Sequence, residues 1–364
     1  MRNSEEQAVF ALRELYRQYG YLPFKMSRFE QYDLYVRNKD YLVSDQIITF
    51  SDKNGKLLAL KPDVTLSIIK NAPDTPGAIQ KVYYAESVYR ADPGSHQIKE
   101  IRQAGLECVG DLGSYEIAEA VLLAAKSLEL LGGDFVLDIS HVGLIRAVLD
   151  ACGIALEDRK EAFRCLRQKN GHELVSLCAD SKARKKLELL AGVSGDAQSV
   201  LTALEPLLTT PQEHQAMAEL ERLCGILHRC GYTQSMRVDF SVGNDMKYYS
   251  GVVFKGYLEG LPFSILSGGQ YDKLLQKMGR TSKAIGFALY LSLLERRDEN
   301  SVSYDVDTLI LHDPQADPER LLALAQEKAK EGSVLVAAAI SEGRSYKRLI
   351  RFENGEAREV GKNG

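Results

Sequence analysis

Apolar residues recur at helical spacing near the start of the chain. Leu12, Tyr16 and Tyr19 fall on one face, and Gly20 follows them. This spacing predicts an amphipathic helix over residues 5–19 that ends at the glycine.

Strand patterns follow this first helix. The segments LLAL and IQKVYYAESVYR predict strands, and FVLDIS predicts a half-buried strand because apolar and polar residues alternate in it. Between them, Ser114 is placed to cap a helix that runs through EIAEAVLLAAKSLELL. From Ser140 to about Gly231 the periodicity is helical only, which predicts a helical insertion.

Strand periodicity returns in MRVDFS, YYSGVVFKGYL and PFSILSGG, and we expect a helix around AIGFALYLSLLERR. Strands that are interrupted by helices and then resume predict an α+β fold with an antiparallel sheet flanked by helices. The polar segment RRDENSVS predicts a linker to a small α/β tail, in which Asn354 and Gly355 signal a hairpin. We therefore expect a core over 1–298, with the insertion over about 141–231, and a small α/β domain over 299–364.

Composition excludes some classes of protein. The chain has 364 residues, and 46 Lys plus Arg against 50 Asp plus Glu give a net charge of -4 without a long run of either sign. No basic nucleic-acid footprint is visible. The first twenty residues offer no apolar run for a signal peptide or a membrane span, which predicts a cytoplasmic protein.

The six cysteines are scattered along the chain, which favours a reducing compartment over a disulfide framework. Cys224, His228 and Cys230 are the closest approach to a metal motif. On a helix their offsets of four and two residues place them on different faces. We expect ordinary helix packing there and no metal site.

Four segments carry polar and aromatic residues that a plain core does not need. LKPDVT contains Asp63 and Thr65, and the next two strands carry Arg90 and the pair Gln103 and Glu107, which share one strand face. The other two segments are VGNDMKYYSG and SGGQYDKLL. Each position alone suits a solvated residue or a structural ion pair, but together they predict an amino-acid pocket with groups for an ammonium, an imidazole and a carboxylate or phosphate.

This joint pattern resembles histidyl-tRNA synthetase, a class II synthetase, over about residues 5–297. LKPDVT resembles the segment that holds the substrate amino group, with Asp63 where the family usually has glutamate. VYRADPG together with IRQAGLE resembles motif 2, with Arg90 as the motif arginine and with Gln103 and Glu107 at histidine-binding positions.

The other two segments extend the resemblance in the same order along the chain. NDMKYYSGVVF resembles the histidine-specific segment RGLDYYTGTVFE and aligns Tyr248 and Tyr249 with its tyrosines. GGQYDKLL resembles GGRYDGL and aligns Tyr271. The resemblance therefore implies a class II synthetase-like fold and a histidine pocket.

Two arginines of the synthetase pattern are missing. Asn244 stands where the histidine-specific segment has an arginine that contacts the α-phosphate, and Leu293 stands where motif 3 ends in an arginine held against ATP. Losing one such transition-state donor typically costs about a hundred- to a thousandfold in rate. The resemblance thus implies a kept amino-acid side and a lost ATP side, with no catalytic residue.

A synthetase-like chain of this kind resembles the regulatory subunits of ATP phosphoribosyltransferase, which are paralogues of the synthetase. That resemblance implies a homodimer within a hetero-oligomer with a short-form catalytic subunit in the first step of histidine biosynthesis, L-histidine as feedback effector, and no cofactor, tRNA or membrane. It places Asp63, Thr65 and Gln103 around the histidine amino group and Arg90 at the carboxylate. Glu107 and Tyr249 would bind the imidazole, while Tyr271 would close a pocket that Tyr248 also lines.

Two alternatives stay open at this point. One is a divergent synthetase, or another amino-acid-activating ligase, that is still active. The other is a scaffold that activates the catalytic subunit while its own pocket is vestigial.

Overall fold

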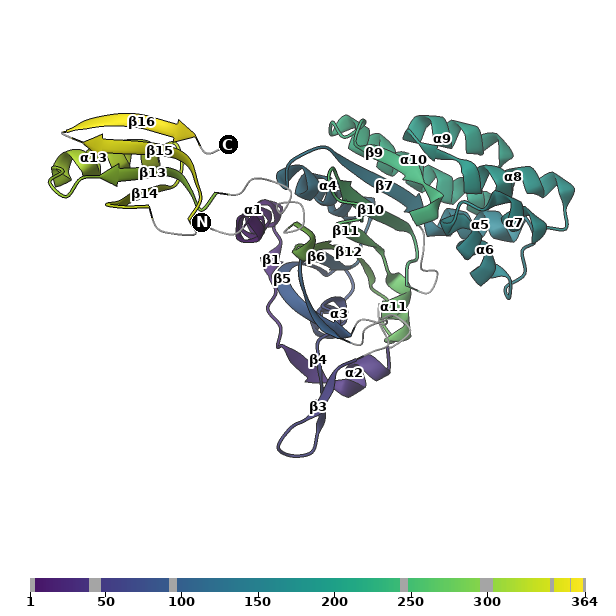
Figure 1. Cartoon of the computed structure of the whole chain (residues 1–364). Helices are drawn as coiled ribbons and strands as arrows, with labels where there is room; N and C mark the ends of the chain where they lie inside the picture. Colours follow the sequence, from purple (N-terminus) through teal and green to yellow (C-terminus); the bar gives the residue numbers. More distant parts are fainter. Residues whose placement is uncertain are drawn as a thin grey trace. The chain divides into compact units, whose positions relative to one another are not determined.

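The computed structural model describes residues 4–38, 47–91, 97–242, 248–294, 304–340, 344–353 and 355–362, and it forms two compact units (Figure 1). The larger unit is Ala8–Leu293, and the smaller one combines Met1–Gln7 with Leu294–Gly364. The border that the sequence suggests, between residues 298 and 299, lies outside the described residues.

A nine-stranded sheet forms the centre of the larger unit, in the order β1-β5-β6-β12-β11-β10-β7-β9-β8. Its strands are antiparallel to their neighbours except for the parallel pairs β1–β5 and β7–β9. The strands are β1 (Leu22–Pro23), β5 (Ile79–Ala91), β6 (Ile98–Gly110), β7 (Phe135–His141), β8 (Ser194–Gly195), β9 (Met236–Asp239), β10 (Val252–Leu258), β11 (Leu266–Gln270) and β12 (Lys283–Tyr290).

Helices cover the two faces of this sheet. On one face, α1 (Ser4–Gln18) and α4 (Ser114–Leu130) are joined by a hydrogen bond of 3.0 Å between the Tyr16 and Ser127 hydroxyls. The ring of Tyr16 also packs edge-on against Phe287 of β12, at 6.1 Å between centroids. Because side chains alternate along a strand, the neighbours of Phe287 in β12 face the opposite side, where α3 (Thr65–Asn71) and α11 (Asp272–Lys277) lie.

A separate three-stranded sheet lies beside α3. It has the order β2-β4-β3, and its strands are β2 (Phe29–Gln31), β3 (Thr49–Ser51) and β4 (Leu57–Leu60), with the short helix α2 (Tyr32–Val36) next to β2. The strand β4 ends at Leu60, the first residue of the LKPDVT segment, so this sheet fixes where that segment enters the site.

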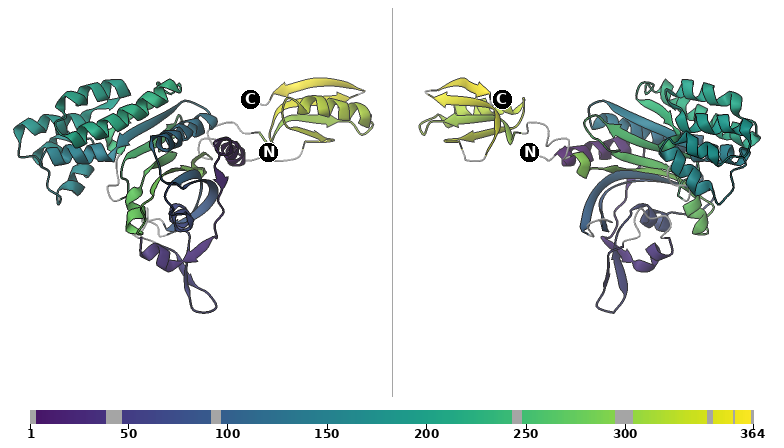
Figure 2. Two further views of the ribbon diagram at one scale, coloured as in Figure 1. Left: turned by 180° about the vertical axis from the view of Figure 1, so that it is seen from behind. Right: turned by 45° about the vertical axis from the view of Figure 1, so that its right-hand side comes forward.

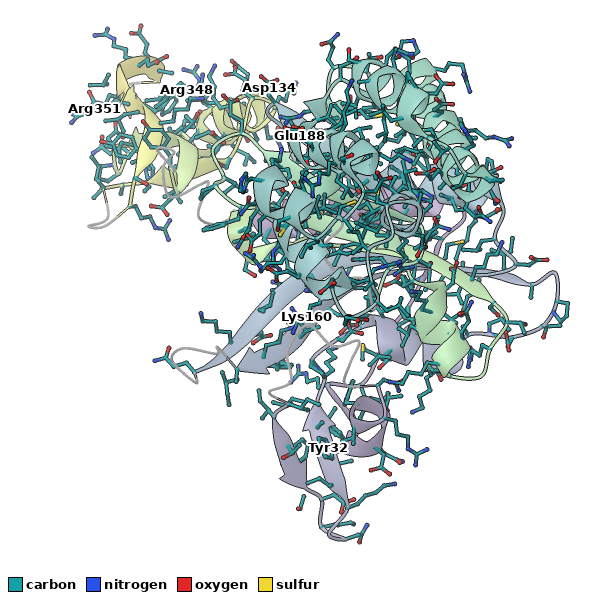
Figure 3. All side chains as sticks on the ribbon, turned by 90° about the vertical axis from the view of Figure 1, so that its right-hand side faces the viewer. Tyr32, Asp134, Lys160, Glu188, Arg348 and Arg351 are labelled. Carbon is teal, nitrogen blue, oxygen red and sulfur yellow. The ribbon has the colours of Figure 1, made fainter. Side chains whose placement is uncertain are left out.

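The helical insertion gathers beyond β7 and β9 at one end of the large sheet (Figure 2). Its exposed surface is charged, with Lys160 and Glu188 among the side chains that project from it (Figure 3). Its helices are α5 (Val142–Ala151), α6 (Arg159–Arg167), α7 (Gly171–Ser176), α8 (Ser181–Gly192), α9 (Ala197–Leu204) and α10 (Pro211–Arg229), with the 3-10 turns η2 (Glu205–Leu207) and, after β9, η3 (Phe240–Val242).

Three local predictions were wrong. The segment around AIGFALYLSLLERR begins as β12, and helical residues appear only at 292–294. Gly113, not Ser114, is the N-cap of α4. The insertion is not purely helical, because Ser194 and Gly195 pair with β9. A two-residue strand is too short to show a period, and the all-apolar run of β12 hides its alternation.

The smaller unit contains a four-stranded sheet in the order β14-β13-β15-β16. Its elements are β13 (Val306–His312), α13 (Pro318–Ala329), β14 (Val334–Ala337), β15 (Tyr346–Glu353) and β16 (Glu356–Lys362). β15 and β16 pair as an antiparallel hairpin at the predicted place, with Gly355 at a φ of 81°. Its small core consists of Ile310, Ile350 and Phe352.

In the part of the chain that the structure describes, every helix is too short or too polar to cross a lipid bilayer.

Candidate functional site

The floor of the site is the sheet face opposite α1 and α4. Gln103 and Glu107 lie on this face of β6, with Gly105 between them. Directly across on β12, Gly286 is paired with Glu107 and Ala288 with Gly105. The small residues leave a hollow between the two polar side chains.

Two glycines of the floor have no room for a side chain. A Cβ on Gly286 would lie 1.7 Å from Glu107 Oε2, and one on Gly105 would lie 2.1 Å from the carbonyl oxygen of Phe287. Real Cβ atoms do not approach other atoms so closely, so the Glu107 carboxylate occupies space that only glycine provides.

One wall of the site is the segment between β4 and α3. Asp63 Oδ1 accepts a hydrogen bond of 2.9 Å from the backbone N–H of Leu66, in the first turn of α3. Arg90 Nε donates to the carbonyl oxygen of Pro62 at 3.0 Å, which ties the segment to β5. The guanidinium is thereby fixed through Nε, and its two terminal nitrogens remain for a ligand.

Three tyrosines form the opposite wall. The rings of Tyr248 and Tyr249 meet edge to face with 4.9 Å between centroids, and the ring of Tyr271 lies 5.5 Å from that of Tyr248. Tyr271 is only 2 % exposed. The aromatic wall therefore excludes water from the polar groups beneath it.

These groups line one cavity of about 380 Å³. All the positions predicted to bind histidine are among its lining residues: Asp63, Thr65, Arg90, Gln103, Glu107, Tyr248, Tyr249 and Tyr271. The structure thus brings together side chains from segments that are as far apart as residues 63 and 271.

Glu107 is the electrostatic centre of the cavity. Its side chain accepts hydrogen bonds from Thr65 Oγ1, at 2.7 Å, and from the hydroxyl of Tyr271. Glu107 is 2 % exposed, and this burial raises its pKa to about 8 in spite of the two hydrogen bonds. Burial also raises the pKa of Asp63, opposed by the Leu66 N–H and by the charge of Arg90.

The side chain of Gln103 is the clearest sign that the cavity takes a ligand. Gln103 is only 4 % exposed, and its amide has no hydrogen-bond partner among the residues that the structure describes. The amide faces the cavity, where it can both donate to and accept from a polar group of a ligand.

Comparison with known proteins identifies the family. The sequence profile of the family described as histidyl-tRNA synthetase matches residues 2–294. The chain belongs to the histidyl-tRNA synthetase family. The predicted class II fold is confirmed.

Several relatives of this histidyl-tRNA synthetase family member are named not as synthetases but as regulatory subunits of ATP phosphoribosyltransferase. The ATP phosphoribosyltransferase regulatory subunit of Alkaliphilus metalliredigens is 29 % identical over 287 residues, which cover 76 % of this chain and 72 % of the relative. A structure of an ATP phosphoribosyltransferase regulatory subunit/histidyl-tRNA synthetase from Bacillus halodurans has a TM-score of 0.73 at 24 % identity, with 97 % of each chain covered. A chain of the ATP phosphoribosyl transferase (HisG:HisZ) complex from Thermotoga maritima has a TM-score of 0.62 at 19 % identity, covering 79 % of this chain and 97 % of that one.

Asn244 and Leu293 stand at the two positions where the synthetase family has the missing arginines. Asn244 lies outside the described residues. Leu293 is half-buried in the helical turn after β12 and is not among the residues that line the cavity. An apolar side chain at this position offers no contact for a phosphate.

Sequence reasoning missed several lining residues of the synthetase-like cavity. Tyr290 lies directly opposite Gln103, and Lys255 and Ser267 are paired across β10 and β11. Tyr290 was missed because its strand was expected to be a helix. Lys255 was readable, because a lysine that interrupts the apolar strand VVFKGYL is unusual.

Groups that resemble a metal site elsewhere in the described residues have structural explanations. Glu161, Cys165 and Glu173 have ligand atoms within 4.8 Å of one another, but the Arg164 guanidinium pairs with both carboxylates. Near the end of α10, His228 Nδ1 is engaged with Thr233 Oγ1 at 2.8 Å.

Proposed function

We propose that this chain is a non-catalytic regulatory subunit of ATP phosphoribosyltransferase. It is required for the activity of a short catalytic subunit in the first step of histidine biosynthesis, and it transmits feedback inhibition by histidine. Relatives that carry this name over most of the chain support the proposal. The observation that carries it is the asymmetry of the site, in which the amino-acid groups are in place while both phosphate-binding arginines are replaced.

Histidine fits the cavity through each of its polar groups. Its ammonium lies against Asp63 and Thr65, within reach of the Gln103 amide. Its carboxylate pairs with the terminal nitrogens of Arg90, since the Nε of this arginine is already bonded to Pro62.

The imidazole accounts for the remaining groups of the cavity. One ring nitrogen bonds Glu107 and the other bonds Tyr249, while Tyr248 and Tyr271 cover the ring. Glu107 is pre-oriented for this by its hydrogen bonds to Thr65 and Tyr271. Such pre-organisation lowers the entropic cost of binding.

The same cavity does not support adenylate formation. A charge-assisted hydrogen bond contributes about 1.5–3 kcal/mol, and Asn244 and Leu293 remove two such contacts to phosphate. Even without additivity, the rate of amino-acid activation would fall by several orders of magnitude. Histidine binding without turnover is the behaviour of a sensor.

Histidine acts on the complex with the catalytic subunit by binding its active and inhibited arrangements with different affinities. A ligand shifts an equilibrium between active and inhibited arrangements only if it binds one of them more tightly. We place this chain as a homodimer in a cytoplasmic hetero-oligomer with the catalytic subunit, with L-histidine as effector, no cofactor and no tRNA.

Two measurements on the isolated chain test the proposal. Calorimetry should detect one histidine site, and Glu107→Ala should lose it while the exposed control Glu157→Ala keeps it. Histidine-dependent pyrophosphate exchange should stay at background. Measurable exchange would instead establish a divergent synthetase, and equal histidine affinities of wild type and Glu107→Ala would remove Glu107 from the site. A chain that activates the catalytic subunit without binding histidine would be a scaffold.

A further inference from the structure

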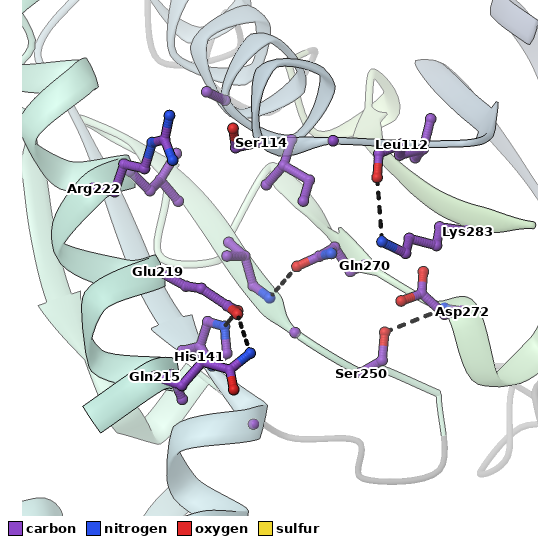
Figure 4. Close-up of a pocket in the computed structure, with 18 of the residues that line it drawn as sticks. Leu112, Ser114, His141, Gln215, Glu219, Arg222, Ser250, Gln270, Asp272 and Lys283 are labelled. Atoms are coloured by element: carbon purple, nitrogen blue, oxygen red, sulfur yellow. Dashed lines mark hydrogen bonds and ion pairs between the residues drawn. The ribbon is translucent and has the colours of Figure 1, made fainter. Parts of the chain in front are cut away.

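A second cavity, of about 530 Å³, lies between the sheet and the helices α4, α5 and α10 (Figure 4). It shares a wall with the first cavity, because Tyr271 lines the first one and its chain neighbours Gln270 and Asp272 line the second. Successive residues at the end of β11 thus face two different spaces.

Part of the lining of this second cavity is aliphatic. It comes from the first turn of α4, from α5 and from one face of α10, where the residues recur at helical spacing. On these helices the apolar side chains of the lining are Ile117, Ala118, Ala147, Ala216, Leu223 and Ile226. Alanines at three of these positions provide the space.

Two polar residues of the lining are already engaged by the protein. His141 Nδ1 accepts from the Leu144 N–H at 3.0 Å, so Nε2 carries the proton and donates to Glu219 at 3.2 Å. Glu219 also accepts from the Gln215 amide at 3.2 Å. This pair lines one side of the cavity, and its hydrogen bonds hold the His141 ring and the Glu219 carboxylate in place.

The opposite side carries charges of both signs with bonding capacity to spare. Lys283 Nζ donates to the Leu112 carbonyl oxygen at 3.3 Å, which uses one of its three N–H groups. Asp272 Oδ1 accepts from the Ala284 N–H at 3.0 Å, which uses one of about four acceptor positions. Burial raises the pKa of Asp272, opposed by hydrogen bonds from the Ala284 N–H and the Ser250 side chain and by the charge of Lys283.

Gln270 lies between these charges and the aliphatic walls. Its Oε1 accepts from the Val252 N–H at 2.8 Å, so the orientation of its amide is fixed. The amide nitrogen is turned away from this contact and has two N–H groups to offer.

A carboxylate, an ammonium and an amide donor side by side, next to an aliphatic chamber, complement an α-amino acid. We propose that the second cavity binds a small aliphatic amino acid, with its carboxylate on Lys283 and Gln270, its ammonium on Asp272, and its side chain against α4 and α10. The two charges of a zwitterion match both side chains, whereas a ligand with one charge matches only one of them.

Equilibrium dialysis of the full chain with radiolabelled L-leucine tests this assignment. The competitors are 4-methylpentanoate and 3-methylbutylamine, which keep the same isobutyl group but lack the ammonium or the carboxylate. Leucine should bind saturably, and each competitor should bind with at least tenfold lower affinity than leucine. Competitors as strong as leucine would show a merely apolar groove and overturn the proposal, as would the absence of saturable binding.

Variants then place the leucine in the second cavity. Lys283→Met should weaken leucine binding at least tenfold, while the exposed control Lys160→Met leaves it unchanged. Glu107→Ala should leave leucine binding intact. If instead Glu107→Ala removes leucine binding and histidine displaces leucine stoichiometrically, leucine occupies the first cavity; this overturns the second site and leaves the proposed function standing.

Discussion

The replacement Glu107→Gln tests how the first cavity recognises the imidazole. Glu107 is buried, and its pKa is raised to about 8 by this burial. The imidazole of free histidine has an ordinary pKa of about 6.5. Glutamine keeps the shape of the side chain but removes its charge and its titration.

The number of protons bound before and after binding gives the expected pH dependence of the histidine affinity. Between about pH 6.5 and pH 8, Glu107 of the free protein holds one proton and the free imidazole holds none. The bound pair of carboxylate and imidazolium contains the same single proton. Binding therefore takes up no proton, and the affinity for histidine does not change with pH in this window. Above pH 8 the free carboxyl has lost its proton, and binding must take one up. Affinity should then fall about tenfold per pH unit.

The size of the effect follows from the bond that is lost. A hydrogen bond to a charged group contributes about 1.5–3 kcal/mol, which corresponds to about 10- to 150-fold in affinity at pH 7. The ratio of wild-type to Glu107→Gln affinity should therefore be of this size at pH 7 and should shrink above pH 8. Titration of the histidine amino group affects both proteins alike and cancels in the ratio.

Calorimetry of both proteins from pH 6.5 to pH 9.5 measures the ratio, and Glu157→Gln serves as the control for an exposed glutamate. A ratio that stays constant up to pH 9.5 would refute the shared-proton pair. It would mean either that Glu107 does not contact the imidazole or that the imidazole binds as the neutral ring.

Three further outcomes are expected. Arg90→Met should weaken histidine about 10- to 150-fold and leave histidinol, which has no carboxylate, unchanged in calorimetry. Gly286→Ala should abolish histidine binding, because its Cβ would lie 1.7 Å from Glu107 Oε2; an unchanged affinity would mean that the carboxylate is not held as described. Lys61→Met should lower the free energy of unfolding by about 3–5 kcal/mol in urea, since it leaves Glu86 without its ion-pair partner, and the double variant with Glu86→Gln should recover most of the loss.

Much of the first cavity could be predicted because its residues lie in short segments with a readable pattern. Gln103 and Glu107 are four residues apart in a strand, so they share a face whatever the strand pairs with. The tyrosines and the LKPDVT segment were recognised by resemblance. Their convergence on one space depends on the sheet order, in which β12 and β11 separate β6 from β10.

The other residues of the two cavities could not be predicted, because their positions depend on strand pairings that no local sequence pattern shows. The middle of β12, from Ala284 to Leu289, is apolar because both faces of the strand are covered, so its sequence gives no strand period. Its misassignment as a helix hid both Tyr290 and the role of Gly286 beneath Glu107. The second cavity was equally hidden, because Gln270, Asp272 and Lys283 have ordinary neighbours in sequence and meet only across strand ends.

The central claim is tested most directly by the steady-state rate of ATP phosphoribosyl transfer by a short-form catalytic subunit from the same genome. The account predicts little activity from that subunit alone, strong activation when this chain is added, and inhibition by histidine that the Glu107→Gln chain no longer transmits while it still activates. Full activity without this chain, or equal inhibition by histidine with the wild-type and Glu107→Gln chains, would contradict it.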